Sequence, residues 1–118
     1  MPNSFDEIAR RAAQRLSGDL DHNLPATVEA QLQAGGRAPE RYEPATVIAL
    51  AALVLNVAKF AWDVYRDRKK DAAVAPSAEA IARTIRIDLK ADEGISVEQR
   101  EKVISVVVDE LIKAPPQS

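Results

Sequence analysis

Apolar residues recur at three- and four-residue spacing along much of this chain, which predicts helices rather than strands. The first such set, near the N-terminus, consists of Phe5, Ile8, Ala9, Ala12, Ala13 and Leu16. Ser4–Glu7, at the start of this segment, has the form of a capping box, and Gly18 is a natural helix stop. We therefore expect a first helix whose apolar face lies on a core.

A second, shorter helix is predicted where Leu24, Val28 and Leu32 follow one another at four-residue intervals. Two adjacent glycines at 35–36 end it, so the two helices form an N-terminal pair over 4–36. The next segment, 37–44, carries two prolines and no apolar periodicity. It is therefore predicted to be a loop, and it is the best candidate boundary within the chain.

The most informative segment is the apolar run from Ala45 to Trp62, which only Thr46, Asn56 and Lys59 interrupt. A cationic stretch, 66–70, follows it and complements the negative end of a helix dipole. We expect one long central helix over 44–70. Because the run is apolar on nearly every side, this helix is either buried all round or crosses a membrane.

The C-terminal part is predicted to be a helical hairpin over 77–114. Ser77 is placed to cap one helix, and 96–99 form a second capping box at the start of the other. Alternating or β-branched residues at 84–90 and 103–108 leave strands open as an alternative, although the caps favour helices. The expected fold is thus all-α, a small single-domain bundle of about five helices around a long apolar central helix.

Two locations follow from the two interpretations of 45–62. The part without strongly polar groups, 45–55, is shorter than the ~18 to 20 residues that usually span a bilayer, so we expect a soluble, cytoplasmic protein. The N-terminal residues also lack the pattern of a signal peptide. The alternative is a single-pass inner-membrane protein with a cytoplasmic C-terminal hairpin, because Trp62 and Tyr65 before a basic cluster are typical of a membrane interface.

The sequence carries no catalytic signature, so we expect no enzyme, no cofactor and no metal site. The chain has no cysteine, and its single histidine, His22, has no second imidazole to complete a transition-metal site. The acidic segment 88–94 fails as a calcium loop because carboxylates are missing at the required spacing. A net charge of -2 makes nucleic-acid binding unexpected, although the arginines at 10, 11 and 15 and the 66–70 cluster keep it as a weaker alternative.

Assembly is the functional class that the apolar run favours. A helix of this kind is difficult for 118 residues to cover fully, so we expect a homo-oligomer or a protein effector partner. The function predicted is a non-enzymatic interaction or assembly module, acting as an adaptor or accessory subunit. The predicted contact residues are Leu50, Leu53, Val57, Phe60, Trp62 and Tyr65.

One resemblance adds a biological setting. The segment 53–70, with the sequence LVLNVAKFAWDVYRDRKK, is followed by Pro76 and the helix-forming stretch 81–86. This part of the chain, within 45–90, resembles small helical accessory proteins of bacterial conflict (defence) systems. The resemblance implies an adaptor or assembly component that works beside a separate effector, and it includes no catalytic motif.

Overall fold

The computed structural model describes residues 4–33, 45–71, 77–88 and 95–114. These residues form five α-helices and no strand, which confirms the all-α prediction. The helices are α1 (Ser4–Leu16), α2 (Leu24–Gln33), α3 (Ala45–Asp71), α4 (Ala78–Asp88) and α5 (Val97–Lys113).

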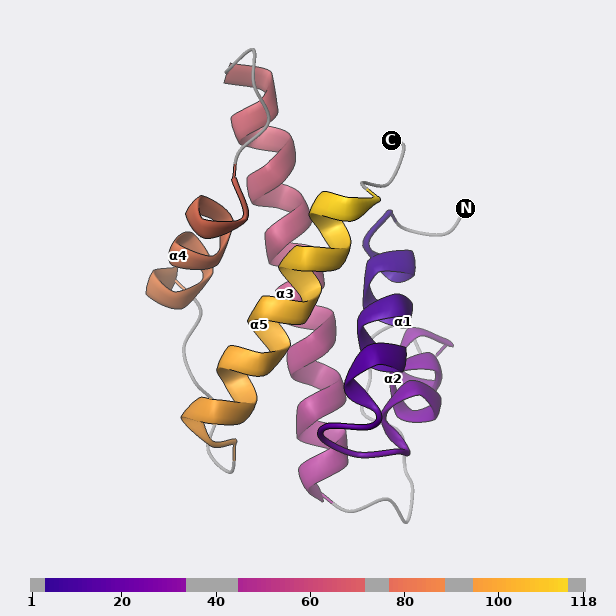
Figure 1. Cartoon of the computed structure of the whole chain (residues 1–118). Coiled ribbons are helices and arrows are strands. Elements are labelled where there is room, and N and C mark those ends of the chain that lie inside the picture. Colours follow the sequence, from indigo (N-terminus) through magenta and orange to yellow (C-terminus); the bar gives the residue numbers. More distant parts are fainter. Residues whose placement is uncertain (1–3, 34–44, 72–76, 89–94, 115–118) are drawn as a thin grey trace.

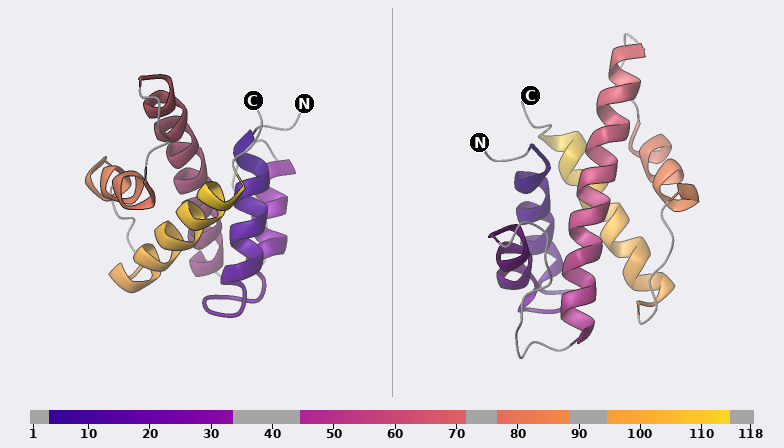
Figure 2. Two further views of the ribbon diagram at one scale, coloured as in Figure 1. Left: turned by 45° about the horizontal axis from the view of Figure 1, so that its top comes forward. Right: turned by 180° about the vertical axis from the view of Figure 1, so that it is seen from behind.

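Helix α3 is the centre of the bundle, and it contacts each of the other four helices (Figure 1). The pair α1 and α2 lies along one side of its N-terminal half. Helix α5 crosses it obliquely, and α4 lies beside its C-terminal half (Figure 2). Helices α1 and α5 also contact each other, so the first and last helices of the chain close one side of the bundle.

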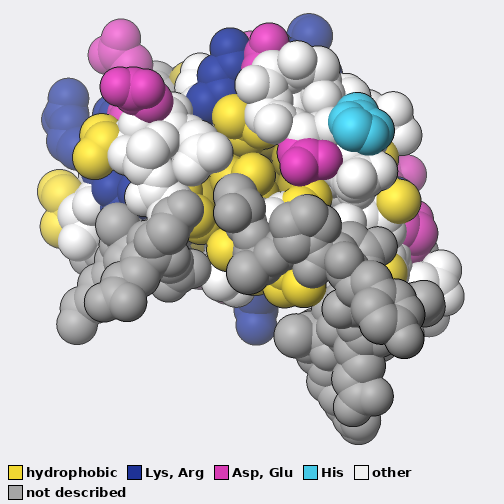
Figure 3. Space-filling view, turned by 90° about the horizontal axis from the view of Figure 1, so that it is seen from below, with side chains coloured by type: hydrophobic (Ala, Val, Ile, Leu, Met, Phe, Trp, Pro, Cys, Tyr) yellow, Lys and Arg dark blue, Asp and Glu magenta, His cyan; other side chains and the backbone are white. Residues whose placement is uncertain are grey.

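The core is built from small aliphatic side chains that let the helices approach closely. Three alanines of α3, at 51, 58 and 61, are fully buried, and Val54 and Val57 lie between them. Helix α1 contributes Ile8 and Leu16, both fully buried. Viewed from the end where α3 begins, apolar side chains show at the centre with an acidic side chain beside them, and most other charged side chains lie toward the margin (Figure 3). The apolar run is therefore covered mainly by the chain's own helices.

Two of the three polar interruptions of the apolar run lie where α3 meets solvent. Asn56 and Lys59 are exposed, and they share one side of the helix because they are three residues apart. Four partly exposed apolar positions on the same side, together with Asn56, form what we call the α3 open face: Ile48, Ala49, Ala52 and Leu55. Seen from behind, α3 lies in front of the other described helices (Figure 2, right), and near its start Gln31 of α2 donates to the backbone carbonyl of Ile48 at 3.2 Å.

The caps predicted in the C-terminal half are present. Ser96 accepts a hydrogen bond from the Gln99 backbone N–H, and the Gln99 side chain accepts one from the Ser96 N–H. Ser77 Oγ accepts from the Ala80 N–H at 3.1 Å. The strand alternative is wrong for 84–88 and 103–108, which are helical, while 89–90 lie outside the described residues. The side chain of Ser4, and with it the first capping box, also lies outside them.

The stretch Val47–Arg68 within α3 is long and apolar enough to cross a membrane, judged by length and composition alone. The core helix of a soluble bundle meets the same criterion, and just over half of the most apolar part of this stretch, 56%, is buried inside the fold. The structure is thus compatible with both predicted locations.

Candidate interaction surfaces

The six residues predicted to contact a partner lie almost entirely inside the bundle. Leu50, Leu53 and Val57 are at most 2% exposed, and Trp62 and Tyr65 are each 6% exposed, whereas Phe60 is partly exposed. Packing within the chain therefore accounts for five of the six. A partner contact at those five positions stays a prediction, and it would require α3 to be uncovered first.

Two aromatic residues of this set, Trp62 and Tyr65, stack on each other. The rings of Trp62 and Tyr65 are 5.8 Å apart and nearly parallel. The Arg66 guanidinium lies 5.6 Å from the centre of the Trp62 ring and also pairs with Asp63 at 2.9 Å. These contacts give part of the cationic stretch a structural role within α3.

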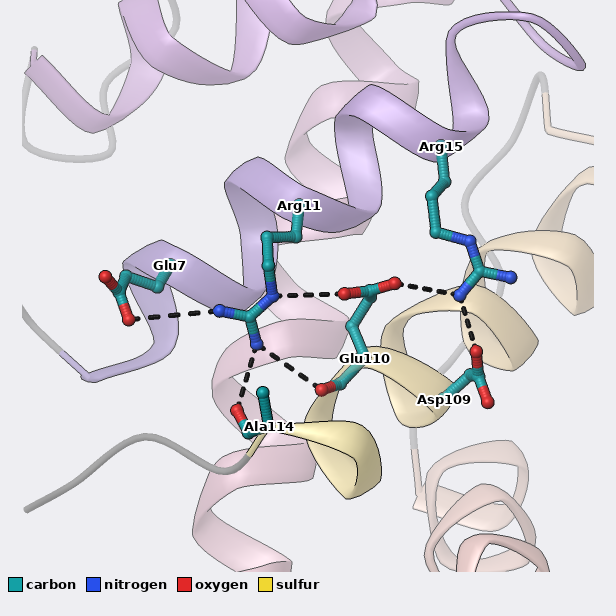
Figure 4. Close-up of polar contacts among 6 residues, drawn as sticks. All are labelled: Glu7, Arg11, Arg15, Asp109, Glu110 and Ala114. Atoms are coloured by element: carbon teal, nitrogen blue, oxygen red, sulfur yellow. Dashed lines mark hydrogen bonds and ion pairs between the residues drawn. The ribbon is translucent and has the colours of Figure 1, made fainter.

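A polar junction that no local sequence pattern indicates joins α1 to α5 (Figure 4). The carboxylate of Glu110, whose side chain is 9% exposed, accepts from Arg11 Nε at 3.0 Å and from Arg15 Nη1 at 2.9 Å. Arg15 also pairs with Asp109, and Arg11 donates to the backbone carbonyl of Ala114 at 3.0 Å. We call these residues the α1–α5 junction.

The two arginines decide the charge state of Glu110. Burial alone raises the pKa of this carboxyl, but hydrogen bonds from Arg15 and Arg11 outweigh it, and the pKa lies below its ordinary value. The pKa of Arg15 is raised by its hydrogen bonds to Glu110 and Asp109. Glu110 is therefore a carboxylate at neutral pH, and the junction is a set of charge-assisted hydrogen bonds.

The other arginine of α1 is also paired. Arg10 binds Glu29 of α2 in a two-pronged contact, with bonds of 2.8 and 3.0 Å. The hydrogen bond from Arg10 lowers the pKa of Glu29. All three arginines predicted as an alternative nucleic-acid surface are thus engaged with carboxylates. In the 66–70 cluster, Arg68 donates to Thr84 of α4 at 3.2 Å.

An open groove of about 670 Å³ lies between α4 and α5, beside the α1–α5 junction. Its lining includes small or neutral residues from both helices: Ala78, Ala82, Ser105 and Val108. The charged lining residues are Arg15, Glu79, Arg83, Arg86 and Asp109. Arg15 and Asp109 belong to both the groove and the junction, so the ion pair between them fixes one wall.

The three arginines of this groove differ in whether they form ion pairs within the described part of the chain. Arg15 is occupied by Asp109 and Glu110, and Arg86 Nε pairs with Glu101 at 2.7 Å. Arg83 is exposed, and its side chain makes no hydrogen bond or ion pair with any residue that the structure describes. The groove thus presents a guanidinium that the described part of the fold does not use.

The sequence reasoning missed this groove. A signal was present in α4, where Ala78 and Ala82 are four residues apart and Arg83 and Arg86 are three apart. Such spacing places small residues on one side of a helix and cations beside them. The α5 wall was not recognisable, because nothing in the sequence shows which face of α5 meets α4.

Potential metal ligands are scattered. His22 is exposed in the connection between α1 and α2. Across the four described segments, no group of three or more histidine, cysteine, aspartate or glutamate side chains lies close enough to hold a metal ion. The structure therefore adds no metal-binding candidate in these segments to those considered from the sequence.

Comparison with protein-family models, with curated proteins and with solved structures finds no match to this chain.

Proposed function

We propose that this protein is a non-enzymatic assembly module that associates with a second copy of itself through the α3 open face. The observation that supports this most directly is the partial exposure of four apolar residues on one side of the central helix: Ile48, Ala49, Ala52 and Leu55. Apolar surface that a fold leaves open in this way is suited to association, because a partner removes it from water.

The composition of the open face favours a copy of the same helix as the partner. Ala49 and Ala52 are small, so two α3 helices can approach closely. If two copies cross antiparallel at Ala52, Ile48 and Ala49 of each lie beside Leu55 and Asn56 of the other. Such a two-fold contact uses the same patch on both subunits, as closed dimers do.

Self-association is expected to show as concentration dependence. Across a hundredfold dilution, the wild-type mass by light scattering should fall from near twice 12.8 kDa to near 12.8 kDa, and the melting temperature should fall with it. Ala52→Arg should remain monomeric, since its charged side chain occupies the contact but still reaches water in the monomer.

The matched control is Ala26→Arg, the same substitution at an exposed position of α2. This variant should associate as the wild type does. A wild-type monomer at every concentration, with a melting temperature that does not depend on dilution, would refute self-association through α3.

The proposed setting is that of an accessory or adaptor subunit of a bacterial defence system, working beside a separate effector. The support is the resemblance of residues within 45–90 to such accessory proteins. The α3 open face then assembles copies of the module, and other surfaces remain for the effector.

A second candidate is a single-pass membrane protein with its span in the first part of α3. Its specific support is that Val47–Arg68 is long and apolar enough to cross a bilayer. Against it, Asn56 and Lys59 interrupt the run, and they account for its exposed side in the folded bundle.

Fractionation of lysed cells distinguishes the two candidates. We expect the protein in the supernatant after ultracentrifugation, because the bundle covers most of α3. Recovery solely from the membrane pellet, with release by detergent but not by high salt, would favour the span instead.

A further inference from the structure

We propose that the α4–α5 groove binds a carboxylate-bearing segment of a partner protein, with Arg83 and Arg86 as the recognising groups. This extends the assembly role to a second surface, and it does not depend on association through α3. Its partner is defined by chemistry: a segment with acidic side chains next to small apolar ones.

The first argument is the unused charge. Arg83 has no hydrogen-bonding or ion-pair partner in the part of the chain that the structure describes, and Arg86 uses its Nε for Glu101. A guanidinium has five N–H donors in a planar fork, which matches the geometry of a carboxylate. A carboxylate from outside the chain would therefore find donors that the fold has left available.

The second argument is the shape of the groove. Ala82 and Val108 are largely buried, and with Ala78 and Ser105 they line the groove without long side chains to fill it. The exposed Arg83 adjoins this lining. This arrangement suits a segment in which an acidic residue is flanked by alanine-sized or leucine-sized neighbours.

A third feature extends the surface beyond the groove. Ile87 is 75% exposed, and it lies four residues after Arg83, so the two share one side of α4. A partner that binds the cation can also bury this exposed apolar side chain, which removes it from water. Arg83 and Ile87 together offer one charged and one apolar contact.

Nucleic acid fits the groove less well. Two carboxylates, Glu79 and Asp109, stand among its three arginines, and the whole chain has a net charge of -2. A polyphosphate backbone would be repelled by these acids, and nucleic-acid sites usually form a continuous basic surface. A protein segment with only one or two carboxylates can avoid them.

The test uses a short fluorescein-labelled peptide in which aspartate and glutamate alternate with alanine and leucine. Its matched control replaces each acid by the corresponding amide. We expect the acidic peptide to bind the full chain in fluorescence anisotropy, and the amide peptide to bind about tenfold more weakly or worse. In ¹⁵N NMR spectra, the acidic peptide should shift the Arg83 and Arg86 side-chain N–H signals and the backbone amides of Ala82 and Ser105.

Variants locate the site. Arg83→Glu should weaken binding of the acidic peptide by about tenfold or more, because it removes a donor and adds a repelling charge. Lys59→Glu makes the same change of charge at an exposed position of α3 outside the groove, and it should bind as the wild type does. Circular dichroism of both variants checks that the helices are retained, and Arg83→Gln serves if Arg83→Glu does not fold.

Several results would overturn the proposal. They are equal affinity for the acidic and amide peptides, no binding of the acidic peptide at millimolar concentration, or unchanged binding by folded Arg83 variants. NMR shifts confined to other helices would also overturn it, as would tighter binding of duplex DNA at the same residues. If Ala52→Arg is monomeric yet binds the peptide normally, the groove and the α3 contact are separate functions.

Discussion

Leu53→Asp is expected to unfold the protein or to lower its melting temperature by at least about 10 °C. Leu53 is 2% exposed on the central helix, so the new carboxylate would be buried without a partner. Burying an unpaired charge costs several kcal/mol. The net free energy of unfolding of a domain is only about 5 to 15 kcal/mol, so this cost is a large share of it. Thermal melts followed by circular dichroism measure the effect.

Asn56→Asp is the control for this experiment. It places a carboxylate on the same helix, three residues further on, but at an exposed position. Measured at the lowest concentration of the dilution series, where the chain is monomeric, its free energy of unfolding should stay within about 0.5 kcal/mol of the wild type. If Leu53→Asp and Asn56→Asp melted at the same temperature, Leu53 would have to be solvated and the packing around α3 would be wrong.

The sequence predicted the helices well because their signals are local. Four-residue apolar spacing and the Ser77 and Ser96 caps involve residues within one or two turns of each other, so each helix is specified by its own segment. The central helix predicted over 44–70 is observed at 45–71. The strand alternative at 103–108 arose from valine-rich composition, and α5 buries these valines on more than one side because it packs against α1, α3 and α4: Val103, Val106, Val107 and Val108 are all buried.

The apolar run does not by itself show which side of α3 the other helices cover. From composition alone, Leu53 and Ala52 are equally apolar, but Leu53 is buried and Ala52 is partly exposed. Only the positions of the other four helices decide between the two sides. Asn56 and Lys59 were the usable signal, because polar residues in an apolar helix mark its solvent side.

The α1–α5 junction was beyond sequence reasoning for a similar reason. Arg11 and Glu110 are 99 residues apart, and Arg15 and Glu110 are 95 apart. The arginines of α1 lie outside its apolar set, and no residue near them in the sequence indicates a partner on α5. Ion pairs between distant segments depend on tertiary packing, which a single sequence does not reveal. The same holds for the groove beside the junction, which needs α4 and α5 to be placed first.

The junction lies next to the proposed peptide-binding groove and shares residues with it. Arg15 and Asp109 bridge α1 and α5, and both line the groove. A partner that competes for these groups would alter the closure between the first and last helices. The proposed contact groups, Arg83 and Arg86, lie on α4 instead, so peptide binding need not disturb Glu110.

Glu110→Gln is expected to lower the free energy of unfolding by about 1 to 2 kcal/mol at pH 7. The amide keeps the size of the side chain but loses the charge that strengthens the bonds from Arg11 and Arg15. The loss is moderate because these arginine side chains are 35% and 43% exposed, so water screens part of the interaction. Glu29→Gln is the matched control, and its loss should be smaller because the side chains of Arg10 and Glu29 are both at least 40% exposed.

The stability that Glu110 contributes depends on pH, because folding lowers the pKa of its carboxyl. The pKa of Glu110 is lower in the folded protein than in the unfolded chain, so unfolding takes up a proton when the pH is between the two values. The stability from Glu110 is therefore complete above the ordinary glutamate pKa and is lost as the pH falls through the lower, folded value. Wild type and Glu110→Gln should differ most at neutral pH and converge in acid. Urea unfolding at a series of pH values measures this, and a gap that stayed constant down to acid pH would show that the charge of Glu110 does not stabilise the fold.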